Sequence, residues 1–227
     1  MSLRESALRL HASRHSAPLL GLLTTVVLLL GTSQAHAQSP VQLVGDGRGV
    51  TTSGPTEAIR LNAYGVLRGG GSWRVRGDGG SASDDAGVGG GLGLRVEIPL
   101  HEYFVLGPMV DFHVLTLDPL LIGDRFRINT LTFGVWSKGR YLFDLSGHPF
   151  EVYVSVPMGL SLYFADQPGW DTQVGVSVGL LLGAQLFINE RFGFLLENGF
   201  RRDGFREDGL KYRTLQFVMN AGISIAF

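Results

Sequence analysis

The chain has 227 residues, a formal net charge of −1, 33 glycines and no cysteine. This near-neutral balance lacks the basic excess of nucleic-acid-binding proteins, so we expect no nucleic-acid partner. The absence of cysteine excludes disulfides, a thiolate metal site and lipid attachment through a cysteine.

The first 37 residues have the pattern of a cleaved secretory signal. Three arginines and a single acid precede an apolar stretch at residues 17–31, and Ala35 and Ala37 supply small residues where a signal peptidase requires them. The apolar stretch is about fifteen residues long, whereas a helix needs roughly 20 to span a bilayer. We therefore predict a signal peptide over residues 1–37 and export of the remainder.

Residues 38–56 contain several glycines and a proline, and we predict a flexible periplasmic leader there. Beyond the leader, apolar residues alternate with small or polar ones, which is the pattern of β-strands. The alternation predicts eight strands, at about 57–68, 86–98, 103–115, 126–143, 150–164, 172–188, 191–200 and 212–227. Long loops are predicted at 69–85, 116–125, 165–171 and 201–211.

Glycine has an unusual place in these strands. It recurs at a period of two on the face opposite the apolar one, as at Gly87, Gly89, Gly91 and Gly93. Glycine normally weakens a strand interior. A narrow eight-stranded barrel explains the placement, because its interior is barely wide enough for side chains. We expect small residues there to make room for a few large ones.

The connections indicate how such a barrel would sit in a membrane. An even number of strands returns both termini to the same side, and short turns then alternate with longer loops, as in outer-membrane proteins. The apolar strand faces suit hydrocarbon. The predicted fold is all-β, an eight-stranded antiparallel up-and-down transmembrane β-barrel over residues 57–227.

The final strand ends at Phe227 after an alternating apolar face that includes Leu215, Phe217 and Ile223. A terminal aromatic closing such a strand resembles the C-terminal signature of bacterial outer-membrane β-barrel proteins. The whole of 57–227 resembles the small barrels of the OmpA/OmpX type. This resemblance implies an outer-membrane location, contact with outer-membrane lipid, and recognition of Phe227 as an insertion signal by the barrel assembly machinery. We expect a monomer.

Several charged residues have inward parity, and most lie in the half of the barrel that we predict to be periplasmic. Charges in a narrow lumen must be paired, so the main interpretation is a structural ion-pair network that fills the bore. A gate or proton relay is the functional alternative. The network is predicted to comprise Arg60, Arg95, Glu97, Lys138, Arg140, Glu151 and Glu197. Trp136 also has inward parity.

Catalysis is the next question, because barrels of this size include lipid A deacylases and acyltransferases. Asp111 and His113 share a strand face, but it is the inward one, and no outward serine accompanies them. The remaining histidines outside the signal, His101 and His148, are far away in sequence, so no metal site is predicted. We expect no enzyme activity and no cofactor.

The leading functional hypothesis is therefore a non-enzymatic barrel that displays surface loops for adhesion, envelope integrity or surface recognition. One alternative is a small pore or lipid-active barrel. Another is a soluble lipocalin-like barrel that binds a hydrophobic ligand, in which the apolar face would line the cavity. The loop sequences do not identify a partner.

Overall fold

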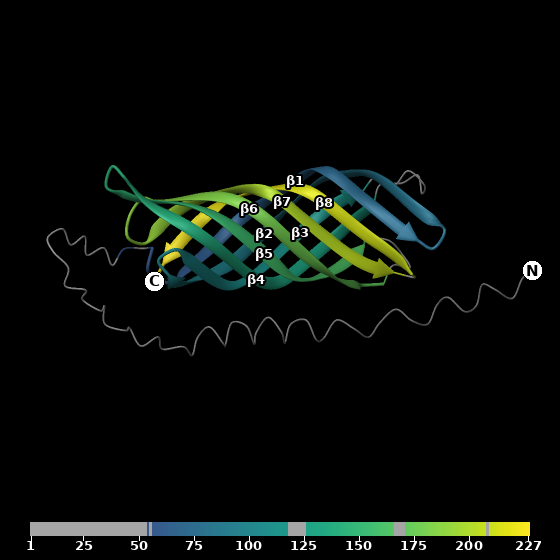
Figure 1. Cartoon of the computed structure of the whole chain (residues 1–227), viewed down its shortest axis with the longest axis horizontal. Helices are drawn as coiled ribbons and strands as arrows, with labels where there is room; N and C mark the ends of the chain where they lie inside the picture. The colour runs from purple at the N-terminus through teal and green to yellow at the C-terminus, as the bar shows by residue number, and fades with distance from the viewer. Residues whose placement is uncertain (1–53, 55, 118–125, 166–170, 208) are drawn as a thin grey trace, which may run out of the picture. The chain divides into compact units, whose positions relative to one another are not determined.

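The structure is a computed structural model that describes residues 54, 56–117, 126–165, 171–207 and 209–227. The predicted signal peptide and nearly all of the predicted leader lie outside these residues. Eight antiparallel strands pair in chain order, and β8 pairs with β1 to close the barrel (Figure 1). The predicted fold is confirmed. The strands are β1 (Arg60–Gly77), β2 (Gly80–His101), β3 (Phe104–Leu117), β4 (Phe126–Leu145), β5 (His148–Ala165), β6 (Gln173–Phe187), β7 (Phe192–Glu207) and β8 (Leu210–Ala226).

No helix in the described part of the chain is long and apolar enough to cross a membrane.

One end of the barrel, here called the turn end, carries the β2–β3, β4–β5 and β6–β7 connections and the C-terminus. In the β4–β5 turn, Ser146 has φ 56° and Gly147 has φ 86°. Positive φ at both central residues is what a two-residue hairpin turn of type I′ requires. At the same end, the Phe227 amide donates a hydrogen bond to the Ile59 carbonyl (3.0 Å). The role of Phe227 as an insertion signal stays a prediction.

The opposite end, here called the hairpin end, carries the β1–β2 and β7–β8 hairpins (Figure 1). Most of the two segments predicted as loops, 69–85 and 201–211, is strand, so these predictions were wrong. Pairing continues to Gly77↔Gly80 in one hairpin and to Glu207↔Leu210 in the other. Beyond the apolar part of the barrel the outward face becomes polar, and charges such as Arg201 and Asp203 also stand on the inward face, so the outward apolar alternation that marks the other strands in the sequence is lost. The other two predicted loops lie largely outside the described residues.

A β-bulge changes the facing of the β1–β2 hairpin. The pairing of β1 with β8 shifts between Gly69 and Gly71, and a second shift occurs in β2 between Ala86 and Gly89. Gly70 and Gly71 have φ 58° and 121°, which glycine adopts without strain. One extra residue reverses the parity of everything beyond it. As a result, even-numbered residues of β1 point inward before the bulge and outward after it.

The outward face of the barrel is apolar over its middle. Leu160, Leu182 and Leu196 expose 61%, 59% and 52% of their surface. Aromatic pairs lie towards the two ends of this belt. The ring centroids of Tyr141 and Phe143 are 4.7 Å apart near the turn end, and those of Phe200 and Phe217 are 5.9 Å apart near the hairpin end. Aromatic girdles flanking an apolar belt are typical of barrels that sit in a bilayer.

Interior glycines do two things in this barrel. A Cβ on Gly93 would lie under 3.0 Å from the Tyr64 ring, and one on Gly183 would lie equally close to the Tyr153 ring. These glycines make room for large inward side chains, as expected from the sequence. At Gly107, by contrast, a Cβ would meet the backbone carbonyl of Val96 on the neighbouring strand. Glycine there permits close approach of two backbones.

Candidate functional site: the barrel interior

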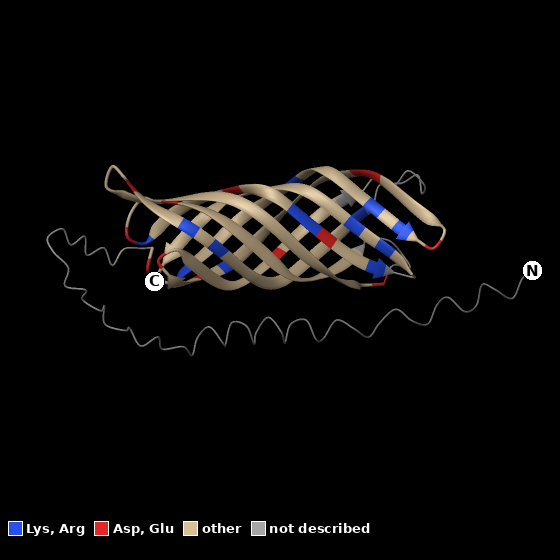
Figure 2. Ribbon diagram, viewed as in Figure 1, with Lys and Arg blue, Asp and Glu red and all other residues tan. Residues whose placement is uncertain are grey.

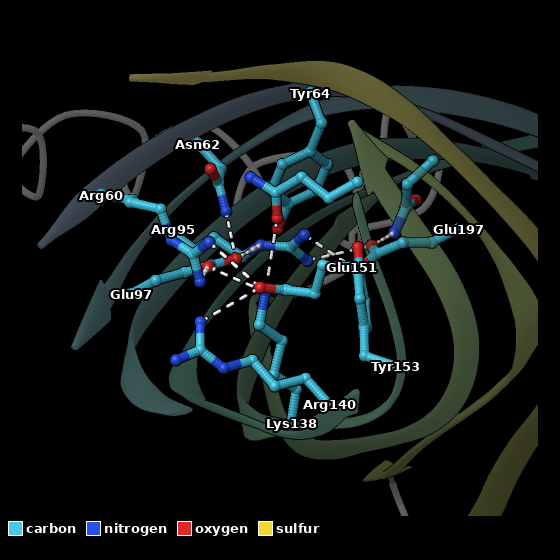
Figure 3. A network of polar contacts seen from close by, with 12 residues as sticks. Arg60, Asn62, Tyr64, Arg95, Glu97, Lys138, Arg140, Glu151, Tyr153 and Glu197 are labelled. Carbon is cyan, nitrogen blue, oxygen red and sulfur yellow. Dashed lines mark hydrogen bonds and ion pairs between the residues drawn. The ribbon is translucent and has the colours of Figure 1, made fainter. Parts of the chain in front are cut away.

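The barrel interior nearest the turn end holds a cluster of buried charges contributed by five strands. Each side chain is at most 5% exposed, and Figure 3 shows them converging from the wall towards the axis. This cluster, here called the lower network, contains all seven residues singled out in the sequence: Arg60, Arg95, Glu97, Lys138, Arg140, Glu151 and Glu197.

Glu151 is shared by three cations of the lower network. Its carboxylate forms ion pairs with Arg60 (3.1 Å), Arg140 (3.1 Å) and the Lys138 ammonium. Arg140 reaches it diagonally, because Leu142 is the residue paired directly with Glu151. The Arg140 guanidinium also donates to the carbonyls of Glu102 and Thr56, each at 2.8 Å. Arg140 therefore ties the network to the turn end.

Two further carboxylates complete the lower network. Glu97 pairs with Arg60 (2.5 Å) and Lys138 (2.9 Å) and accepts a hydrogen bond from Asn62. Glu197 pairs with Arg95 (2.8 Å). It also accepts hydrogen bonds from the Tyr153 hydroxyl and the Asn220 amide, each at 2.9 Å. Every carboxylate thus has more than one donor, which offsets the cost of burying its charge.

Aromatic rings fill the space between the charges. The Arg95 guanidinium lies 4.0 Å from the Trp136 ring centroid and 4.9 Å from that of Tyr64. The Lys138 ammonium lies 4.4 Å from the Tyr153 centroid. Cations over ring faces are stabilised by the ring quadrupole. Trp136, only 1% exposed, points inward as its parity predicted.

A second cluster of buried charges lies nearer the hairpin end, and the sequence analysis did not predict it as a network, although it placed Asp111 on the inward face. This upper network consists of Arg68, Asp111, Arg201 and Asp203. Arg68 pairs with Asp203 (2.6 Å), and Arg201 pairs with Asp111 (2.6 Å) while its Nε donates to the Ser177 hydroxyl (2.6 Å). Arg201 and Asp203 fell in a predicted loop. Their period-two spacing from Glu197 was the available signal.

Tyr64 connects the two networks. Its ring lies beside the Arg95 guanidinium of the lower network, and its hydroxyl donates to Asp111 of the upper network. Asp111 and His113 share the inward face, as the sequence predicted, and the Asp111 oxygens contact Tyr64 and Arg201. His113 is buried, and among the described residues its Nδ1 has no hydrogen-bond partner.

Towards the hairpin end an aromatic and aliphatic cluster covers the upper network. Phe205 lies between Tyr163 and Tyr212, with ring centroids 4.7 Å away on both sides. Leu115 and Ile128 pack against these rings, and Trp73 contacts them from beyond the bulge. The cavity left beneath the cluster, about 20 Å³, has room for about one water molecule. The interior is therefore filled along its length by paired charges and rings.

Paired charges and aromatic rings fill this interior in the described part of the chain. The buried carboxylates are engaged by cations, and no His, Cys, Asp and Glu side chains in the described ranges form a group of three or more that could hold a metal ion. No serine contacts His113 or Asp111 in the hydrogen bonds of the described residues. What the arrangement can do is hold eight strands in one register and exclude water from the axis.

Neither a family model nor a curated protein matches the sequence. Among solved structures, the chain is similar to the outer membrane protein OprG from Pseudomonas aeruginosa. The two are 12% identical over 75% of this chain and 96% of that chain, with a TM-score of 0.52. Neisserial surface protein A (NspA) is 16% identical, with 74% and 97% covered and a TM-score of 0.41. The outer membrane protease OmpT from Escherichia coli is 10% identical, with 78% and 99% covered and a TM-score of 0.39. At this identity, the likeness to OprG shows a shared fold.

Proposed function

We propose that this chain, which has the fold of the small bacterial outer-membrane β-barrels, is an outer-membrane protein without catalytic activity that holds its hairpins at the cell surface. The barrel acts as a rigid, sealed support. In this proposal the assembly machinery inserts the barrel, outer-membrane lipid surrounds it as a monomer, and the hairpin end faces outward.

The observation that carries the proposal is the filled interior. The two networks place eleven charged side chains inside the bore, and each of them is at most 5% exposed. An eight-stranded barrel has little space inside to begin with. Paired charges in such a confined site stay in contact with one another and leave no continuous water path. A sealed bore supports a role carried by the outer surface and the hairpins.

The facing of the side chains weighs against the lipocalin-like alternative. A barrel that carries a hydrophobic ligand needs an apolar interior, whereas here Arg60, Glu97 and Glu151 are inside with no exposed surface. Large apolar residues such as Leu160 and Phe200 are outside. Exposed apolar area of this extent requires a nonpolar environment. A lipid bilayer supplies it.

The small-pore alternative makes the opposite prediction about conductance, and planar-bilayer recording of the purified protein distinguishes the two. We expect no steady current from the wild type. Glu151→Gln should raise the leak, because Arg60, Lys138 and Arg140 lose a shared carboxylate and repel one another. Glu190→Gln, in the exposed β6–β7 connection, is the matched control and should behave as wild type.

A large, steady, porin-like current from the wild type would overturn the sealed-support proposal in favour of a pore. An unchanged leak in a folded Glu151→Gln variant would show that the lower network does not seal the bore. Folding of each variant is checked by its circular dichroism spectrum before recording.

A further inference from the structure

Six basic side chains project outward from three neighbouring strands at the hairpin end. β1, β8 and β7 are adjacent in the barrel, and their outward positions beyond the apolar belt are all basic except Gly204 and Ser72. Figure 2 shows blue segments close together on these strands. This surface, here called the basic patch, consists of Arg74, Arg76, Arg202, Arg206, Lys211 and Arg213.

Strand pairing places like charges of the basic patch directly opposite one another. Arg74 pairs with Arg213 and Arg76 with Lys211 in the β1–β8 register, while Lys211 also pairs with Arg206 in the β7–β8 register. Like charges directly opposite each other destabilise a sheet. Among the described residues, no carboxylate forms an ion pair with any of the six. The interior charges of the same strands are, in contrast, all paired.

The neighbouring residues indicate where the basic patch lies relative to the apolar belt. Arg202 pairs with Leu215, one step along the strands from the aromatic pair Phe200 and Phe217. On β7 and β8 the patch therefore begins where the apolar belt ends. That level corresponds to the headgroup region of a surrounding bilayer.

A groove on the outer surface joins the basic patch to apolar side chains. It measures about 520 Å³, and Arg202, Arg206, Lys211 and Arg213 line one side. Val174, Val176 and Val178 of β6 line the other side, and Val174 and Val176 are each 61% exposed. One wall of the groove suits acyl chains, and the other suits anionic oxygens.

We propose that the basic patch binds the phosphate groups of a phosphorylated lipid in the surrounding leaflet, with the lipid's acyl chains against Val174, Val176 and Val178. Guanidinium groups match phosphate oxygens with two parallel hydrogen bonds, and a lysine ammonium adds a point charge. Bound phosphates relieve the repulsion among the cross-strand cations. The chemistry recognised is a phosphomonoester next to hydrocarbon. This inference concerns the outer surface and is independent of whether the bore conducts.

The test measures lipid retained by the folded protein in a zwitterionic detergent, using native mass spectrometry. Phosphatidic acid is the probe, phosphatidylcholine is the lipid control and inorganic phosphate is the competitor. We expect phosphatidic acid to bind and phosphatidylcholine to bind far more weakly. Arg74→Gln combined with Arg213→Gln should weaken phosphatidic acid binding about 10- to 30-fold, because each cation near a headgroup contributes about 1 kcal/mol.

The matched control combines Arg127→Gln with Arg191→Gln, which removes two exposed cations outside the patch and should leave binding unchanged. Val176→Ser tests the hydrocarbon wall and should weaken phosphatidic acid binding while sparing inorganic phosphate. Equal retention of phosphatidic acid by the patch variant and the wild type would overturn the proposal. Full competition by inorganic phosphate, with no effect of Val176→Ser, would identify a soluble phosphate ligand and overturn the lipid assignment.

Discussion

At the scale of single residues, burial of charge governs this interior. Moving a charged group out of water costs several kcal/mol even after the protein relaxes, and the lower network offsets this cost by sharing. Glu151 has three cationic partners and Glu97 has Arg60, Lys138 and a longer contact to Arg95 (3.6 Å). Arrangements of this kind specify one register, because a strand shifted by one residue would point its charged side chains into the lipid.

The fit between Gly93 and Tyr64 gives a prediction at this scale. Gly93→Ala would place a methyl group against the Tyr64 ring and the Asp111 carboxylate. Both are held by their mutual hydrogen bond, so the clash is not relieved by a simple rotation. We expect the free energy of unfolding to fall by about 1–3 kcal/mol, measured by urea titration of the barrel in lipid vesicles.

Gly139→Ala is the control for that titration, because a Cβ at Gly139 would meet nothing within 4 Å. Its effect should stay below about 0.5 kcal/mol. Equal stability of the two variants would mean that Tyr64 moves aside readily and that Gly93 is not required for its packing.

The sequence identified most of the inward charged residues in strands with one clearly apolar face, although it missed Arg68 at the end of the first predicted strand. Arg60, Lys138 and Glu197 lie in such strands, and simple alternation placed them inside. It could not show which cation meets which carboxylate. Those pairings join residues far apart in the chain, such as Arg60 and Glu151, and depend on how the closed barrel brings opposite walls together.

At the scale of the elements, β7 illustrates how a strand changes surroundings along its length. Its outward side chains are Phe192, Phe194 and Leu196 near the turn end, and Arg202 and Arg206 near the hairpin end. Arg201 and Asp203 escaped detection because charges stand on both faces of this second part. A segment with that composition has the signature of a loop, and only pairing with β8 reveals the strand.

The change of surroundings along β7 and β8 can be measured with a single arginine. Leu196→Arg, near the middle of the apolar belt, should lower the free energy of unfolding by about 2–4 kcal/mol, because lipid-facing arginine is costly at the midplane. Leu215→Arg, across from Arg202, should cost about 0–1 kcal/mol near the interface. Chemical unfolding in vesicles gives both values, and similar costs at the two sites would show that our placement of the belt is wrong.

At the scale of the whole molecule, closure removes the sheet edges over the apolar belt, where each described strand pairs with a neighbour on both sides. The β1–β8 register extends from Arg60↔Ala226 to Arg76↔Lys211, so nearly the full length of the first strand is covered by the last. A closed sheet satisfies its backbone hydrogen bonds internally, which is what hydrocarbon demands. Over the belt, closure also leaves no unpaired strand edge to join another chain.

A cellular experiment tests location and orientation together. We expect the mature protein to begin at Gln38 by N-terminal sequencing and to sediment with the outer membrane. An epitope tag inserted at Gly79, in the β1–β2 turn, should be accessible on intact cells. The same tag at Gly147, in the β4–β5 turn, should become accessible only after the outer membrane is permeabilised. Recovery as a soluble periplasmic protein would contradict the membrane assignment.

Because of the bulge at Gly69–Gly71, the number of residues in the β1–β2 hairpin determines which of its side chains point into the barrel. Beyond the bulge, Trp73 closes the bore and Arg74 joins the basic patch because one extra residue has reversed the strand's parity. A change of one residue on β1 between the bulge and Trp73 would exchange these two roles, whereas a change of two would preserve them. Insertions or deletions in this segment of β1 thus keep the facing of the hairpin residues only when they come in even numbers. An odd number would turn Trp73 outward and Arg74 inward, so that the barrel would lose both the ring that closes the bore and one cation of the basic patch.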